Sequence, residues 1–264
     1  MSQIRIGVQI APQHASYQQI RDTVVELEQL GVDVLFNWDH FYPLSGEPDG
    51  LHFEGWSMLA AWAEQTTDVE FGCLVTCNSY RNADLLADMA RTVDHISAKD
   101  GKPGRLIFGI GSGWFERDYL EYGYDFGATP GVRLDALAES LPRIEARWAK
   151  LNPAPTRDIP VLIGGGGEKK TLRIVAQHAD IWHSFSDLET LNRKKAILAE
   201  HCAAVGRDVD DITLSVEFGR HDPKAVGDGF VDAGVRLFTV GISGPDHSQG
   251  IEKVKAALAW RDAL

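Results

Sequence analysis

Cysteine is scarce in this sequence, and long apolar runs are missing. The three cysteines, Cys73, Cys77 and Cys202, are an odd number, and the opening residues lack the basic segment and apolar core of a signal peptide. Both observations argue against a disulfide framework. The spacing of Cys73 and Cys77 within an apolar run favours burial over zinc binding. Without an apolar stretch long enough to cross a bilayer, we expect a cytoplasmic protein with no membrane partner.

Positive charge is also in short supply. The 26 Lys and Arg residues are outnumbered by 38 Asp and Glu residues, which gives a net charge of −12. Such a balance disfavours the phosphates of nucleic acids and of anionic lipids, so we expect no nucleic-acid partner. A small anionic ligand stays possible, because local amides and a few cations can hold one. We therefore expect the partner to be a small molecule.

Strand-like and helix-like segments alternate along the whole chain, without a low-complexity linker. The β-rich runs are residues 4–10, 34–37, 70–76, 105–111, 160–164, 180–185, 211–219 and 236–242. A helix expected at 133–150 contains Pro142, which should kink it or start a new first turn. Strands that alternate with helices predict a parallel sheet. Eight units favour one domain, residues 1–264, folded as a (β/α)8 TIM barrel, and a doubly wound open sheet is the alternative.

A polar pair ends the second predicted strand. In a barrel the active site lies at the carboxyl ends of the strands, and Asp39 and His40 follow such an end. Histidine titrates near neutral pH, so His40 suits general acid–base chemistry, although a solvated strand end is the alternative. A metal site built from His14, His40 and His52 lacks any local ligand spacing, so we predict no metal.

Two glycine-rich stretches end other predicted strands. Gly164–Gly167 lies before a helix with Lys169 close by, and free backbone N–H groups at a helix start bind anions. This run predicts a phosphate site, with a flexible turn as the alternative. Gly109, Gly111 and Gly113 alternate along the fourth strand, which would let a flat molecule approach closely or let the strands pack tightly.

Aromatic residues gather at the same predicted strand ends. Trp38, Trp114 and Trp182 each follow or end a strand, and Glu217 does so on the seventh run. Some of these rings must belong to the core, because aromatic residues dominate cores. We nevertheless predict that these four residues line a substrate pocket. A planar pocket beside a phosphate site indicates a nucleotide-like or flavin-like cofactor.

Several separated motifs resemble the luciferase-like flavin-dependent superfamily, and within it the coenzyme F420-dependent oxidoreductases common in actinobacteria. They are DHF at 39–41, CLVTC at 73–77, GIGSG at 109–113 and GGGGEK at 164–169. The resemblance implies the same barrel and a hydride transfer between the deazaflavin and a small organic substrate. It implies that His40 performs proton chemistry and that Asp39 orients either His40 or the ring system.

The resemblance also implies where a cofactor binds. Relatives often have a non-prolyl cis peptide under the cofactor ring, which here would join Leu74 and Val75. The implied cofactor-binding residues are Leu74, Val75, Thr76, Gly111, Ser112, Gly113, Gly164, Gly165, Gly166, Gly167 and Lys169.

Two departures from the pattern of these relatives bear on the substrate. Trp114 stands where some F420-dependent sugar-phosphate dehydrogenases have an acid, and the segment from Trp148 to Pro160 is short.

Three hypotheses of function therefore stand at this point. The leading one is an F420-dependent oxidoreductase, whose cofactor carries an acidic tail that needs basic residues such as Lys169, Lys170 and Arg81. An FMN-dependent luciferase-like monooxygenase fits the same glycine-rich site. A flavin- or deazaflavin-binding protein without catalytic activity is the hypothesis from another class. Relatives commonly dimerise, so the resemblance implies a homodimer.

Overall fold

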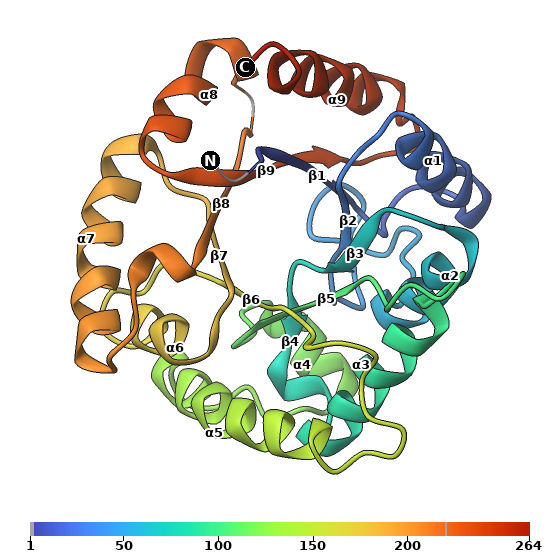
Figure 1. The fold of residues 1–264 in the computed structure, drawn as a ribbon. Coiled ribbons are helices and arrows are strands. Elements are labelled where there is room, and N and C mark those ends of the chain that lie inside the picture. The colour runs from blue at the N-terminus through green and yellow to red at the C-terminus, as the bar shows by residue number, and fades with distance from the viewer. Residues whose placement is uncertain (1–2, 220) are drawn as a thin grey trace.

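A ring of parallel strands forms the centre of the computed structural model, which describes residues 3–219 and 221–264 (Figure 1). Within those residues the strands are β1 Arg5–Ile10, β2 Val34–Asn37, β3 Glu70–Cys73, β4 Thr76–Cys77, β5 Leu106–Gly111, β6 Val161–Gly164, β7 Ile181–Ser184, β8 Thr213–Glu217 and β9 Val235–Ile242. Strand β1 pairs with β9 and strand β3 with β5, so the sheet closes on itself. The predicted (β/α)8 TIM barrel is confirmed, and the open sheet is excluded.

The third position of the barrel is shared by two short strands. We predicted one strand at 70–76, whereas the chain leaves β3 after Cys73 and resumes pairing at Thr76. The peptide bond between Leu74 and Val75 is cis, as the resemblance implied. Both residues pack with the cluster inside the barrel instead of alternating between its two faces. The prediction of a continuous strand is therefore wrong at its carboxyl end.

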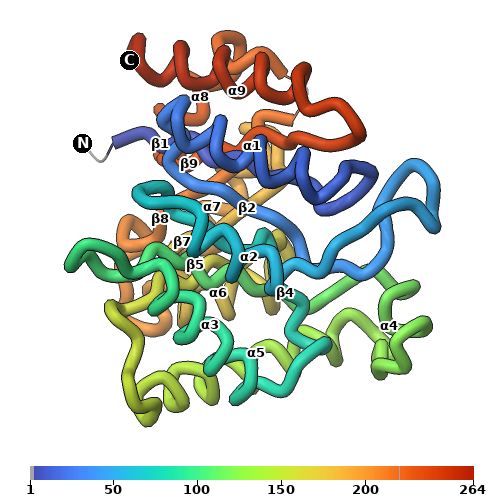
Figure 2. The backbone as a smooth tube through the Cα atoms, turned by 90° about the vertical axis from the view of Figure 1, so that its right-hand side faces the viewer, coloured from blue at the N-terminus to red at the C-terminus, as the bar shows by residue number. Residues whose placement is uncertain are grey.

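Helices cover the outside of the barrel (Figure 1). They are α1 Tyr17–Gln29, α2 Gly55–Gln65, α3 Ala83–Ser97, α5 Pro130–Trp148, α6 Thr171–His178, α7 Leu188–Ala204, α8 Pro223–Asp232 and α9 Ser248–Arg261, and the short helix α4 Glu116–Tyr122 lies beyond the end of the barrel (Figure 2). Helix α5 starts at a Thr129 cap and passes through Pro142 as one helix, so Pro142 does not begin a new first turn. Among the described residues, no helix has the length and apolar character needed to cross a membrane.

Two apolar clusters explain why one end of the barrel is left for a site. The larger cluster lies between the strands and the helices. The smaller one fills the barrel itself and consists of Val34, Phe36, Leu74, Ile107, Leu162, Ile181 and Leu237, with Val75 packed against it. Beyond this plug, toward the carboxyl ends of the strands, inward positions hold Gly111, Gly164 and His183. Small and polar side chains there leave space that the plug does not fill.

Two segments extend past the barrel at that end. In Figure 2 the chain between β2 and α2 projects on the same side as helix α4. Hydrogen bonds join them, because Arg117 on α4 donates to the backbone carbonyl of Pro48 and to Asp49. The segment after β2 supplies Trp38, Asp39, His40 and Leu44 to the lining of the cavity described next.

Candidate active site

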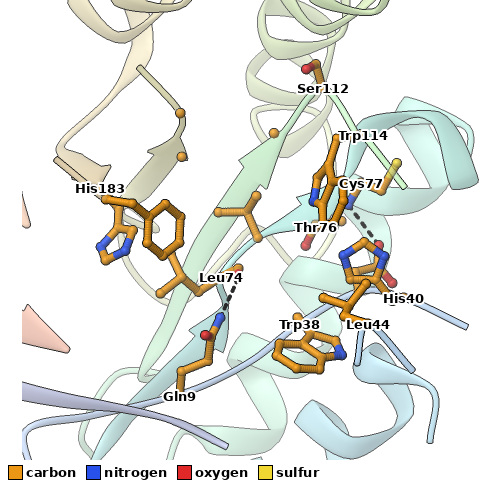
Figure 3. Close-up of a pocket in the computed structure, with 17 residues that line it drawn as sticks. Gln9, Trp38, His40, Leu44, Leu74, Thr76, Cys77, Ser112, Trp114 and His183 are labelled. Carbon is orange, nitrogen blue, oxygen red and sulfur yellow. Dashed lines mark hydrogen bonds between the residues drawn. The ribbon is translucent and has the colours of Figure 1, made fainter. Parts of the chain in front are cut away.

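A cavity of about 550 Å³ lies at the carboxyl ends of the strands. Of the residues predicted for a site, it is lined by Trp38, Asp39, His40, Leu74, Val75, Thr76, Gly111, Ser112, Gly113, Trp114, Gly164 and Gly165. Five further lining residues, Gln9, Leu44, Cys77, His183 and Phe185, were not among the predicted site residues, although all but Leu44 lie at expected strand ends. Figure 3 shows His40, Trp38 and Trp114 on one side of this cavity and His183 on the other. We call it the main pocket.

His40 is held in place by a carboxylate from helix α4. Its Nδ1 lies 2.7 Å from Oδ2 of Asp118, which is fully buried. Oδ2 also accepts from the Tyr80 hydroxyl at 2.9 Å, and Oδ1 accepts from the backbone N–H groups of Phe41 and Tyr42 at 3.2 Å each. Since a carboxylate only accepts, Nδ1 of His40 carries the proton. Nε2 makes no hydrogen bond with a described residue, so it is the ring atom free to act.

Asp39 pairs with Arg81 and not with His40. Its two oxygens accept from Arg81 at 2.7 and 2.9 Å, and Oδ2 also accepts from the backbone N–H of Cys77 at 2.9 Å. Arg81 donates a further bond to Glu54 at 2.6 Å. The expectation that Asp39 orients His40 is therefore corrected, because Asp118 does so. The Asp39 carboxylate ties the end of β2 to the start of β4 and to Arg81.

Burial keeps the other ionisable groups around the main pocket neutral. It lowers the pKa of His183 to about 3, and Nδ1 of that ring lies 2.8 Å from the Ser215 hydroxyl. Burial likewise raises the pKa of the Cys77 thiol to about 11. Behind the pocket, burial lowers the pKa of His52 to about 4, and its Nε2 accepts from the Trp38 indole at 3.1 Å. At neutral pH these three groups carry no charge.

The glycines of β5 and β6 are required by the protein's own packing. A Cβ added at Gly111 would come within 2.7 Å of the Val75 side chain, and one at Gly164 within 3.0 Å. At Gly113 an added Cβ would collide with Tyr119 and Cys77, and the residue has a φ of +79°. We predicted either close approach of a flat molecule or tight packing of the strands, and tight packing is sufficient at these positions. The Leu74–Val75 segment packs against β5 and β6 and forms a wall of the pocket.

The rest of the glycine turn lines a second, shallower opening of about 530 Å³, which we call the basic cleft. Its lining consists of Leu134, Gly166, Gly167, Glu168, Lys169, Lys170, Arg193 and Lys194. Lys170 pairs with Asp135 at 2.6 Å, and Arg193 pairs with Glu168. Lys169 and Lys194 form no ion pair with a described residue. Gly165 lines the main pocket and Gly166 the cleft, so the two openings adjoin along the chain.

Two residues predicted for the substrate pocket lie outside it. The Trp182 side chain is fully buried in the outer cluster, where its indole donates to the Gly165 carbonyl at 2.7 Å. Strand alternation directs the next residue, His183, inward instead, so the prediction for Trp182 is corrected. Glu217 is half-buried at the end of β8 and does not line the pocket, and burial raises its pKa.

Comparison with known proteins gives matches over most of the chain. The family described as luciferase-like monooxygenase matches residues 1–220. An uncharacterized protein of Mycobacterium tuberculosis is 26% identical over 190 residues, which are 63% of this chain and 64% of the relative. The chain thus spans slightly less than two thirds of the length of the first curated relatives it matches.

Relatives with a named activity are also matched. An F420-dependent glucose-6-phosphate dehydrogenase of Amycolatopsis mediterranei is 25% identical over 240 residues, covering 81% of this chain and 68% of the relative. Among solved structures, an F420-dependent secondary alcohol dehydrogenase in complex with an F420-acetone adduct superposes with a TM-score of 0.84. That match covers 98% of this chain and 99% of the other, and at 17% identity it supports the fold alone.

Proposed function

The chain belongs to the luciferase-like monooxygenase family, and on that premise we propose that it is an F420-dependent oxidoreductase. It would transfer a hydride between the deazaflavin and a small organic substrate. The observation that carries the proposal is the adjacency of two openings along one glycine turn. The main pocket offers flat walls and an oriented histidine, and the basic cleft offers unpaired lysines.

The residues present fit such a cofactor. The Leu74–Val75 segment, backed by Gly111 and Gly164, would support a planar ring. The turn at Gly164–Gly167 would receive the phosphate, because backbone N–H groups without side chains can approach an anion closely. Lys169 and Lys194 would hold the acidic tail that distinguishes F420 from FMN. The names of the matched relatives support the same choice.

The chain's own part in the reaction would be proton transfer and positioning. When bound, the deazaflavin supplies the centre that gives or takes a hydride. Asp118 holds the Nδ1 proton of His40, so Nε2 is left to exchange a proton with the substrate. Trp38 and Leu74 line the pocket with apolar surface, which would reduce the water around the reacting groups.

Purification from a host that makes F420, followed by identification of the bound chromophore, tests the proposal. We expect F420 to accompany the protein and its absorbance to change on addition of a reducible or oxidisable substrate. Recovery of FMN with oxygen-dependent turnover would contradict the proposal and favour the monooxygenase. Bound F420 that never changes oxidation state with any substrate would favour a binding protein without catalytic activity.

A further inference from the structure

The walls of the main pocket carry no free cation within residues 3–219 and 221–264. Neither Lys nor Arg lines it. Arg81, from the segment after β4, does not line the pocket, and it is engaged by Asp39 and Glu54 at 2.6 to 2.9 Å. A phosphate or carboxylate in the pocket would therefore find no guanidinium or ammonium group with which to pair.

The ionisable residues that do line the pocket supply no positive charge either. His40 is paired with Asp118, so a protonated ring gives a neutral pair and a neutral ring gives a pair of net negative charge. Asp39 is neutralised by Arg81. His183 is uncharged at neutral pH because burial lowers its pKa to about 3, and the Cys77 thiol stays protonated. The described residues that line the pocket therefore supply no net positive charge to an anion.

The unpaired lysines lie in the basic cleft instead. Lys169 and Lys194 line the opening beyond Gly166, and an added Cβ at Gly166 would collide with the Lys194 ammonium. Under the proposed function these two cations serve the phosphate and acidic tail of the cofactor. Among the residues that the structure describes, this leaves no counter-charge for a second anion in the main pocket.

We propose that the substrate is an uncharged alcohol, or the matching carbonyl compound, and that phosphorylated and carboxylated substrates are rejected. This inference rests on the proposed function. A desolvated anion without a partner is strongly disfavoured, whereas the apolar surfaces of Trp38, Leu44 and Trp114 favour a carbon skeleton. The specificity would thus differ from that of the matched relatives named glucose-6-phosphate dehydrogenases.

The chemistry of the pocket suits such a substrate. Oxidation of an alcohol removes a hydride from carbon and a proton from oxygen, and it leaves a carbonyl group. The oxidised deazaflavin accepts the hydride, and Nε2 of His40 accepts the proton. The reverse reaction takes the hydride from the reduced cofactor and the proton from His40. Neither direction needs a charged group on the substrate.

Matched probes test the proposal on the F420-loaded protein. We would measure the binding of cyclohexanol, hydroxycyclohexanecarboxylate and glucose 6-phosphate by saturation-transfer NMR, and their turnover by F420 absorbance. We expect cyclohexanol to be preferred over both anions by at least about tenfold, equivalent to about 1.4 kcal/mol. Equal or tighter binding of an anion, or no binding of cyclohexanol, would overturn the inference. Anion turnover would leave the proposed function standing, whereas failure of F420 to bind would remove both.

A charge added at the mouth of the pocket provides a second test. Phe185 lines the pocket and the residue is 69% exposed, so its replacement should not prevent folding. We expect Phe185→Lys to reduce the preference for cyclohexanol over the carboxylate by about 2- to 5-fold, the strength of an exposed ion pair. Phe185→Met, of similar length but without charge, should retain the preference. A preference unchanged in Phe185→Lys would show that charge does not set it, and would overturn the inference.

Discussion

The main pocket and the basic cleft adjoin at Gly165–Gly166 but differ in charge and in depth. The pocket is deep, lined by aromatic and aliphatic side chains, and its ionisable groups are neutral or paired. The cleft is shallow and has two lysines without a carboxylate partner among the described residues. Under the proposed function, this difference gives the two regions separate tasks. The cleft would hold a charged portion of the ligand, and reaction at an uncharged group would occur in the pocket.

The largest effect should follow from removing the imidazole proposed to transfer a proton. In His40→Ala we expect kcat for cyclohexanol to fall by about 10²- to 10⁴-fold, the contribution typical of a general acid or base. F420 affinity should change far less than kcat, because the lysines of the cleft are untouched. Stopped-flow absorbance measures the first quantity and fluorescence titration the second. His95→Gln, on α3 and outside the pocket lining, is the control. Full turnover by His40→Ala would contradict the role given to His40.

A smaller effect should follow from changing the residue that positions His40. In Asp118→Asn we expect kcat to fall by about 10- to 100-fold, since an amide no longer fixes the Nδ1–H tautomer. The imidazole ¹⁵N shifts of His40 report the tautomer directly and would not respond to a purely structural role. Glu116→Gln, on the exposed face of the same helix, is the matched control. Unchanged ¹⁵N shifts together with reduced kcat would reject positioning as the cause.

The pocket's buried imidazole should also make stability depend on pH. Burial lowers the pKa of His183 from 6.5 to about 3, so the folded state excludes a proton that the unfolded state binds. Its contribution to stability is fully present above pH 6.5 and is lost as the pH falls toward 3. The slope is at most about 1.4 kcal/mol per pH unit for one proton. Urea unfolding between pH 7 and 5 should show a shallower slope in His183→Leu than in wild type. Equal slopes would contradict the assignment of a neutral buried ring.

Periodicity was sufficient to predict the barrel, since the strand and helix periods alternate in eight units. The local motif at 39–41 was likewise sufficient to predict His40 at its rim. It could not identify Asp118, which is 78 residues from His40 in the chain and has the acidic Glu116 as a near neighbour. Only the closed barrel brings α4 against the loop after β2.

The sequence also could not show which of Trp182 and His183 points into the barrel. Strand β7 is buried on both faces, so its residues show no alternation of polar and apolar side chains from which to read the inward side.

The role of the glycines was ambiguous for a related reason. At Gly111 and Gly113 the need for space comes from Val75 and Cys77, which are distant in the chain, and from Tyr119 on the helix that follows. Sequence reasoning recognised that space was needed there but not what occupies it.

The division between pocket and cleft is tested most directly by titrating the purified protein with F420 and with FMN at two salt concentrations, alongside Lys194→Met and Lys253→Met. Lys253 is exposed on α9, so its variant changes the net charge equally while leaving the cleft intact. We expect F420 to bind more tightly than FMN, and Lys194→Met alone to weaken F420 by about 2- to 5-fold, less so at high salt. Tight binding of FMN with no binding of F420 would contradict the account.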